Sequence, residues 1–184
     1  DRAGGAAHGA RNITSLGGSV TLLSVIGYDE AGTALENLLK DNGVHTELYR
    51  DSNISTTVKL RVLSRQQQLL RIDFEELPTE EILSNKLDIY TKLVSEHDLV
   101  ILSDYGKGCL RYAEKMITAA RALGKPVLVD PKGNDYSHYK GATLLTPNRS
   151  EFQAVAGSWS SEAALTAKAQ ALRASLQLDA LLVT

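Results

Sequence analysis

Short apolar runs alternate with segments of helical spacing along most of this chain, and this alternation limits the folds open to it. Runs that predict buried strands lie at about 21–26, 99–103, 127–130, 141–146 and 181–184. The other segments predict helices at about 6–16, 31–42, 79–94, 112–123, 149–155 and 161–175. Strands joined through helices run parallel, and helices cover both faces of their sheet. The sequence therefore predicts an α/β fold, a parallel sheet flanked by helices.

Alternation with a period of two replaces helical spacing between residues 46 and 74. This pattern predicts antiparallel strands at about 46–50, 56–63 and 69–74, with a turn at 64–67. One face of the last two strands is apolar and consists of Val58, Leu60, Val62, Leu70, Ile72 and Phe74. The other face carries Lys59, Arg61, Arg71 and Asp73. Two interpretations of this basic face remain open: an ordinary solvated surface, or a flap whose cations cover an anionic substrate.

The composition of the 184 residues, 43% hydrophobic and 23% charged with a net charge of -2, is typical of a globular protein with one core. The slightly acidic balance gives no general attraction to nucleic acid, so we expect a small-molecule partner and no nucleic acid. Apolar runs are too short to cross a bilayer and a signal-peptide pattern is absent, which predicts no membrane contact and a cytoplasmic location. The single cysteine, Cys109, excludes an internal disulfide and is expected to pack as a small apolar residue.

The segment 144–152 runs from an apolar strand through a Thr-Pro pair into the start of a helix. Asn148 and Glu151 lie one helical turn apart at this start. A helix N-terminus attracts phosphates, and open α/β sheets bind ligands at the carboxyl ends of their strands. The two residues are therefore candidates for holding a metal nucleotide. A capping box, which needs no ligand, is the alternative.

Charged side chains also follow the two preceding strands. Asp104 and Lys107 lie in a glycine turn after the strand at 99–103, and Asp130 and Lys132 come at the end of the strand at 127–130. A helix cap, a turn cap and a solvated lysine would explain them without function. Beside a bound metal nucleotide, Asp130 would orient a metal-bound water and Lys132 would neutralise phosphate charge.

Six segments of the chain, in order, resemble the ribokinase-like (PfkB) carbohydrate kinases. They lie at 4–13, 57–66, 69–75, 102–108, 129–132 and 144–151. Within this family the resemblance is strongest to the bacterial heptose 7-phosphate kinases, and it covers nearly the whole chain. It implies a ribokinase-like parallel sheet with a small antiparallel β-flap at about 46–74. The chain would then be one partial kinase domain, 1–184.

The resemblance also implies roles for individual residues. ATP would contact Asn148, Arg149, Ser150 and Glu151. Magnesium would be held by Glu151 through water, with Asp130 as a further candidate. The sugar phosphate would contact Gly4, Gly5, His8, Lys59, Arg61, Arg71, Asp104 and Lys107.

Three of the sugar-side residues carry more specific expectations. Gly4 and Gly5 would let the backbone approach the sugar and would act as a hinge for the flap, because glycine has no side chain to obstruct either. His8 stands where close relatives carry asparagine, so its hydrogen-bond geometry toward sugar hydroxyls differs. We expect His8 to form a local hydrogen bond and not to act as a base.

The reaction implied is transfer of the γ-phosphoryl group of Mg-ATP to the anomeric hydroxyl of D-glycero-β-D-manno-heptose 7-phosphate, in lipopolysaccharide core biosynthesis. Members of the family take the catalytic base from a Gly-Ala-Gly-Asp turn, which this sequence lacks and which is expected beyond Thr184. Both ends look cut, so residues 1–184 alone are expected to be inactive.

Two alternatives to this function remain open. A kinase of the same family for a fructose phosphate, ribose or a nucleoside would keep the nucleotide site but would not need the basic face. A binding module that has lost the chemistry is the other. The apolar face of the flap would permit a homodimer, or it would pack on its own domain.

Overall fold

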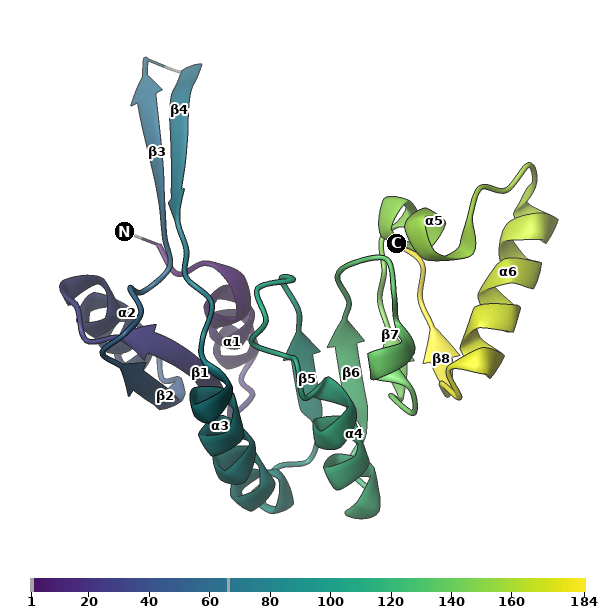
Figure 1. The fold of residues 1–184 in the computed structure, drawn as a ribbon, viewed down its shortest axis with the longest axis horizontal. Helices are drawn as coiled ribbons and strands as arrows, with labels where there is room; N and C mark the ends of the chain where they lie inside the picture. The colour runs from purple at the N-terminus through teal and green to yellow at the C-terminus, as the bar shows by residue number, and fades with distance from the viewer. Residues whose placement is uncertain (1, 66) are drawn as a thin grey trace. The chain divides into compact units, whose positions relative to one another are not determined.

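The computed structural model describes residues 2–65 and 67–184, so Gln66 of the expected turn lies outside the described residues. The chain forms two compact units, Asp1–Ile82 and Leu83–Thr184. Figure 1 shows the order of their helices and strands along the chain.

The first unit combines a parallel strand pair with a hairpin. It contains α1 (Gly5–Ser15), β1 (Thr21–Gly27), α2 (Glu30–Asp41), β2 (His45–Asp51), β3 (Val58–Ser64) and β4 (Gln67–Phe74). Its core is formed by Ala3, Ala7, Ala10, Leu39 and Val44. Helix α2 begins where the Asp29 side chain accepts a hydrogen bond from the Gly32 N–H. Glu36 and Lys40 stand four residues apart, a spacing that predicts an ion pair on a helix, and the structure has this pair with 2.6 Å between Oε1 and Nζ.

The expectation of an antiparallel strand at 46–50 was wrong. Strand β2 pairs in parallel with β1, with Thr21 opposite His45 and Gly27 opposite Asp51. The reason is the intervening helix, because α2 returns the chain to the starting end of β1 and the next strand then runs in the same direction. The period-two pattern of β2 reflects partial burial of alternate side chains near the start of the strand.

The antiparallel part is the pair β3–β4 alone. The register places Val58 opposite Phe74 and Leu60 opposite Ile72, with an irregularity between Val62 and Leu63. Figure 1 shows this pair as an arm that extends beyond β1 and β2. All described side chains of the two strands are exposed, so the arm contributes no side chain to the core of the unit.

The second unit is a four-stranded sheet with helices, and the chain enters it through α3 (Glu80–Leu93) and a short 3-10 turn, η1 (Val94–Glu96). Its further elements are β5 (Val100–Ser103), α4 (Ala113–Ala122), β6 (Val127–Asp130), η2 (Ser137–Tyr139), β7 (Leu144–Leu145), α5 (Arg149–Ala156), α6 (Glu162–Ser175) and β8 (Ala180–Leu181). The strands lie in the order β5-β6-β7-β8.

All neighbouring strands of this sheet are parallel, which confirms the predicted α/β class. Val127, Val129, Leu145, Ile117 and Phe152 form part of its buried core. The strands expected at 141–146 and 181–184 are shorter than predicted, because only two residues of each pair with a neighbour.

Among the helices of residues 2–65 and 67–184, none combines the length and the apolar character that crossing a membrane requires.

Candidate functional site

Most of the predicted residues of the second unit lie at one edge of its sheet. Because β5, β6 and β7 are parallel, their carboxyl ends meet at this edge, and the segments that follow them carry charged side chains. We call Asp104, Asp130, Lys132, Asn148 and Glu151 the strand-end cluster.

The start of α5 confirms the capping box. The Glu151 N–H donates to Asn148 Oδ1 at 3.0 Å, and the Asn148 N–H donates to Glu151 Oε2 at 3.0 Å. The Ser150 hydroxyl also donates to Asn148 Oδ1, at 2.7 Å. Three of the residues expected at the nucleotide thus organise the helix start itself, and nucleotide contact is a role additional to this one.

Glu151 is also paired with Lys132, whose Nζ lies 2.8 Å from Glu151 Oε1. Partial burial acts to raise the pKa of Glu151, but hydrogen bonds from Lys132 and the Asn148 N–H outweigh it and leave the pKa below its usual value. The same contact raises the pKa of Lys132. The pair is therefore fully ionised at neutral pH and joins the segment after β6 to the start of α5.

Asp130 lies in a negative environment. Burial raises its pKa, as do the nearby charges of Glu151 and Asp104, while Lys132 acts in the opposite direction. Like charges that raise a carboxyl pKa would be relieved by a bound cation. The negative charge around Asp130 therefore favours binding of a cation at this edge of the sheet.

At this edge, magnesium would be held through water. Among the residues that the structure describes, no three or more His, Cys, Asp or Glu side chains are grouped to hold a metal ion. Magnesium usually keeps several waters and takes one or two carboxylates together with substrate phosphates. Asp130 and Glu151 are the carboxylates suited to this binding.

Asp104 is held by hydrogen bonds to both of its oxygens. Oδ1 accepts the Gly106 N–H at 2.7 Å, and Oδ2 accepts the Tyr139 hydroxyl at 2.6 Å. Gly106 has a φ of 67°, which favours glycine, and it lies in the same turn as Lys107. The sequence analysis did not identify Tyr139, which is 35 residues from Asp104 in the chain.

A buried lysine behind this turn was also missed. Lys86 of α3 is only 5% exposed, and its Nζ donates to the Cys109 carbonyl oxygen at 2.6 Å. Burial lowers the pKa of Lys86, while the nearby Cys109 and Asp104 oppose this effect. A signal was present in the sequence, because Lys86 falls at helical spacing between the buried Leu83 and Tyr90.

Arg149 points into contacts within its own unit. Its Nη2 lies 3.2 Å from Glu162 Oε1, and its guanidinium lies 5.7 Å from the centre of the Trp159 ring. Both contacts are at the surface, so they leave Arg149 able to exchange partners.

The cations expected on the flap are partly neutralised by their neighbours. Lys59 pairs with Glu75, and with Asp73 at 3.2 Å. Arg71 pairs with Asp73 at 2.7 Å and lies opposite Arg61 in the strand register. Hydrogen bonding to Arg71 is the main cause that lowers the pKa of Asp73 to about 2. The face predicted to be basic is therefore one of mixed charge.

The glycine pair precedes and opens α1. Gly4 is extended at the N-cap position, and Gly5 has a φ of 53°, a conformation that favours glycine. His8 is exposed on the same helix. Gly4 has open space where a side chain would stand, which fits close approach of a ligand to the backbone.

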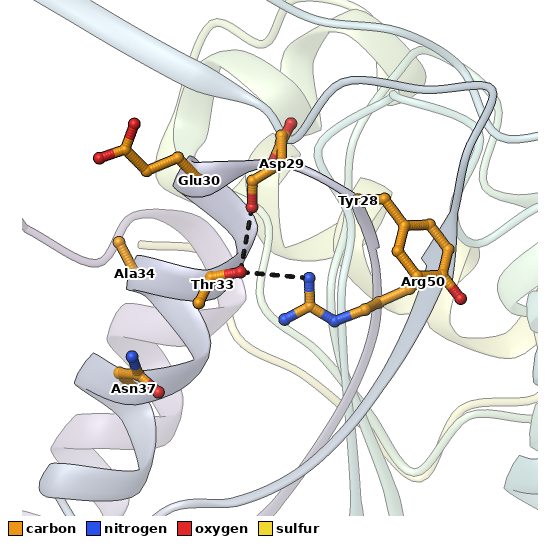
Figure 2. A pocket seen from close by; sticks show the side chains of 7 residues that line it. All are labelled: Tyr28, Asp29, Glu30, Thr33, Ala34, Asn37 and Arg50. Carbon is orange, nitrogen blue, oxygen red and sulfur yellow. Dashed lines mark hydrogen bonds between the residues drawn. The ribbon is translucent and has the colours of Figure 1, made fainter.

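A cavity of about 550 Å³ lies elsewhere in the first unit and contains none of the predicted site residues. It is lined by Tyr28, Asp29, Glu30, Thr33, Ala34, Asn37 and Arg50 (Figure 2). Arg50 donates to Glu36 at 2.6 Å, and Figure 2 shows it turned toward Thr33. These contacts give Arg50 a structural role between β2 and α2.

The order of motifs and the parallel sheet agree with a comparison to known families. The model of the pfkB family of carbohydrate kinases matches residues 1–184. The chain belongs to this family.

Two bacterial relatives of this pfkB-family chain are about half identical to it. D-beta-D-heptose 7-phosphate kinase of Bordetella bronchiseptica is 50% identical over 184 residues, which are 100% of this chain and 59% of the relative. The bifunctional protein HldE of Nitrosococcus oceani is 49% identical over 187 residues, covering 100% of this chain and 39% of the relative. The chain thus spans less than two thirds of the length of either relative.

The fold is also found in a solved structure. The tetrameric inhibited form of phosphofructokinase-2 from Escherichia coli matches 97% of this chain and 60% of its own, with a TM-score of 0.73 and 21% identity. At this identity the match supports the fold and says nothing about the substrate.

Proposed function

We propose that the whole protein carrying this chain is an ATP-dependent heptose 7-phosphate kinase. Its reaction would transfer the γ-phosphoryl group of ATP to the anomeric hydroxyl of D-glycero-β-D-manno-heptose 7-phosphate and yield the 1,7-bisphosphate. The observation that carries this proposal is the 50% identity to a D-beta-D-heptose 7-phosphate kinase across all 184 residues. Because ATP is a cytoplasmic metabolite, we place the activity in the cytoplasm.

In this proposal the strand-end cluster, apart from Asp104, binds the nucleotide. Lys132 and the start of α5, with Asn148, Arg149 and Ser150, would contact the ATP phosphates through positive charge and helix N–H groups. Asp130 and Glu151 would hold magnesium through water. The metal would supply neutralisation of phosphate charge, the main requirement of phosphoryl transfer besides positioning.

The sugar phosphate would be bound by other residues. Lys59, Arg61 and Arg71 would contact its phosphate, which would replace Asp73 as the partner of Lys59 and Arg71. The ion pairs of the flap are exposed to solvent and therefore weak, so a phosphate would replace Asp73 with little loss of stability. Gly4, Gly5, His8, Asp104 and Lys107 would contact the sugar. The base that accepts the hydroxyl proton is not assigned among residues 1–184.

We further propose that the apolar face of the flap joins two copies of the protein. The face carries six apolar side chains that are 36% to 52% exposed. A related fold, phosphofructokinase-2 from Escherichia coli, has been solved in a tetrameric form. Contiguous apolar faces that are exposed in a single chain often mark a surface that binds another molecule.

The proposed reaction is tested by magnesium-dependent conversion of ATP to ADP with the whole protein. The acceptors compared are D-glycero-D-manno-heptose 7-phosphate, fructose 6-phosphate, ribose and no sugar. Turnover with the heptose phosphate alone is the expected result. Turnover with another sugar would overturn the substrate, and no turnover with any of them would favour a binding module.

A further inference from the structure

We propose that Tyr139 is a positioning residue of the kinase, which holds the Asp104 carboxylate and its glycine turn in place against the segment that carries Lys132. The inference rests on the proposed function for its kinetic consequence, but its structural part is independent of any substrate.

Tyr139 lies in the 3-10 turn between β6 and β7 and is fully buried. Its ring is fixed by two neighbours, with centroid distances of 5.7 Å to Tyr136 and 3.9 Å to His138. A buried ring with these contacts has little freedom, so its hydroxyl presents a fixed donor. Tyr139 thus belongs to the core of the unit while its polar end reaches the strand-end cluster.

The hydroxyl joins the segments that follow two different strands. It donates to Asp104 Oδ2 at 2.6 Å and accepts the Lys132 N–H at 3.3 Å. Asp104 follows β5, and Lys132 follows β6 and pairs with Glu151 at the start of α5. One phenol therefore connects the glycine turn to the ion pair that we propose to face the nucleotide.

The carboxylate of Asp104 depends on this donor. Its other oxygen is used by the Gly106 N–H, which closes the glycine turn. Burial and the contact with Asp104 raise the pKa of Tyr139, so the hydroxyl keeps its proton at any pH used for an assay. Without the hydroxyl, Oδ2 would lose a charge-assisted hydrogen bond and the turn would lose its tie to the core.

Tyr136 provides a matched control in the same loop. It is 1% exposed, and its hydroxyl is buried without a hydrogen-bond partner among the described residues. Burial raises its pKa to about 12, so it too stays protonated. Tyr136→Phe and Tyr139→Phe each remove one buried hydroxyl from neighbouring rings, but only the second removes a hydrogen bond to Asp104.

The first test is hydrogen exchange of the amides in residues 103–109 of the whole protein, followed by mass spectrometry. Tyr139→Phe is expected to speed exchange of this turn by roughly tenfold or more, while Tyr136→Phe leaves it unchanged. Equal exchange in the wild type and Tyr139→Phe would overturn the inference, whether or not the protein turns over heptose phosphate.

The second test is kinetic and uses the same variants with the sugar phosphate that the wild type accepts. Tyr139→Phe is expected to reduce kcat/KM for the sugar by roughly tenfold, with KM for ATP changed less than about twofold, and Tyr136→Phe should match the wild type. If Tyr139 acts through Asp104, Asp104→Asn with Tyr139→Phe should be no slower than Asp104→Asn alone. Additive losses would show a general structural effect and overturn the positioning role. An inactive wild type would reject the proposed function while the exchange result still decides the positional claim.

Discussion

Asn148 serves the start of α5 through its side-chain oxygen, so substitutions there change helix stability as well as the surface offered to a nucleotide. Asn148→Ala should reduce the free energy of unfolding by about 1 kcal/mol, because the Glu151 N–H loses its acceptor. Asn148→Asp should leave that free energy nearly unchanged, since aspartate caps equally well. The added negative charge should nevertheless raise KM for ATP by about tenfold. Urea unfolding and the ATP dependence of turnover measure the two effects. An unchanged KM for ATP in Asn148→Asp would contradict the nucleotide role.

Thr56, which precedes β3, belongs to a buried hydrogen-bond network, and its hydroxyl is expected to contribute to the stability of the fold. It is 7% exposed; its hydroxyl donates to Asp29 Oδ1 at 2.7 Å and accepts the Gly27 N–H at 2.8 Å. Thr56→Val should therefore reduce the free energy of unfolding by about 1–3 kcal/mol, because the Gly27 N–H loses its acceptor and Asp29 Oδ1 keeps only the Gly32 N–H of its two donors. Thr56→Ser keeps the hydroxyl and is the control. Equal urea midpoints for the two variants would show that the hydroxyl contributes nothing.

At the scale of elements, the ion pairs of the β3–β4 arm predict a specific response to acid. The native pKa of Asp73 is about 2, below its ordinary value of 3.8. The stabilisation from its pairing is therefore complete above pH 3.8 and is lost as the pH falls through about 2. Arg71→Gln should move the carboxyl titration of Asp73 up toward 3.8, because Arg71 is the main cause of the lowered pKa. Arg61→Gln should leave it in place. A carbon-13 NMR titration of the carboxyl group distinguishes these outcomes.

Local sequence patterns predicted an element correctly where interactions between neighbouring residues determine it. The strand at 127–130, the start of α5 and the Glu36–Lys40 pair follow from apolar runs, capping residues and helical spacing, all of which act over a few residues. The pairing of β2 did not follow, because an alternating pattern suits the edge of a parallel sheet as well as a hairpin.

The candidate site shows the same limit. The aspartate, lysine and asparagine residues at the strand ends could be predicted, because they directly follow the apolar runs that predict the strands. The Tyr139–Asp104 contact joins residues 35 positions apart, and only the packing of η2 on the sheet brings them together. Lys86 lies between these cases, since its place on the apolar side of α3 was readable but its acceptor, the Cys109 carbonyl, was not.

At the scale of the whole molecule, the stability of the β3–β4 arm requires an explanation. Two-stranded hairpins are marginally stable in water unless a face is covered. The six apolar side chains of the flap face remain 36% to 52% exposed in the single chain. Covering these side chains with the same face of a second copy would remove their exposed area from water, which stabilises the pair by about 25 cal/mol per Å² of apolar surface. In a dimer with two-fold symmetry, each of these contacts would occur twice.

A charged substitution at the centre of this face tests the homodimer. Leu60 and Ile72 lie opposite each other in the register, so Leu60→Glu with Ile72→Glu places four like charges in the proposed interface. We expect the whole wild-type protein to sediment as a dimer or a larger even oligomer, and the double variant to sediment as a monomer with α1 to α6 intact by circular dichroism. Leu16→Glu, which alters an apolar residue 89% exposed at the C-cap of α1 and outside the arm, should sediment like the wild type. A monomeric wild type, or a double variant of unchanged mass, would show that the apolar face does not join two copies.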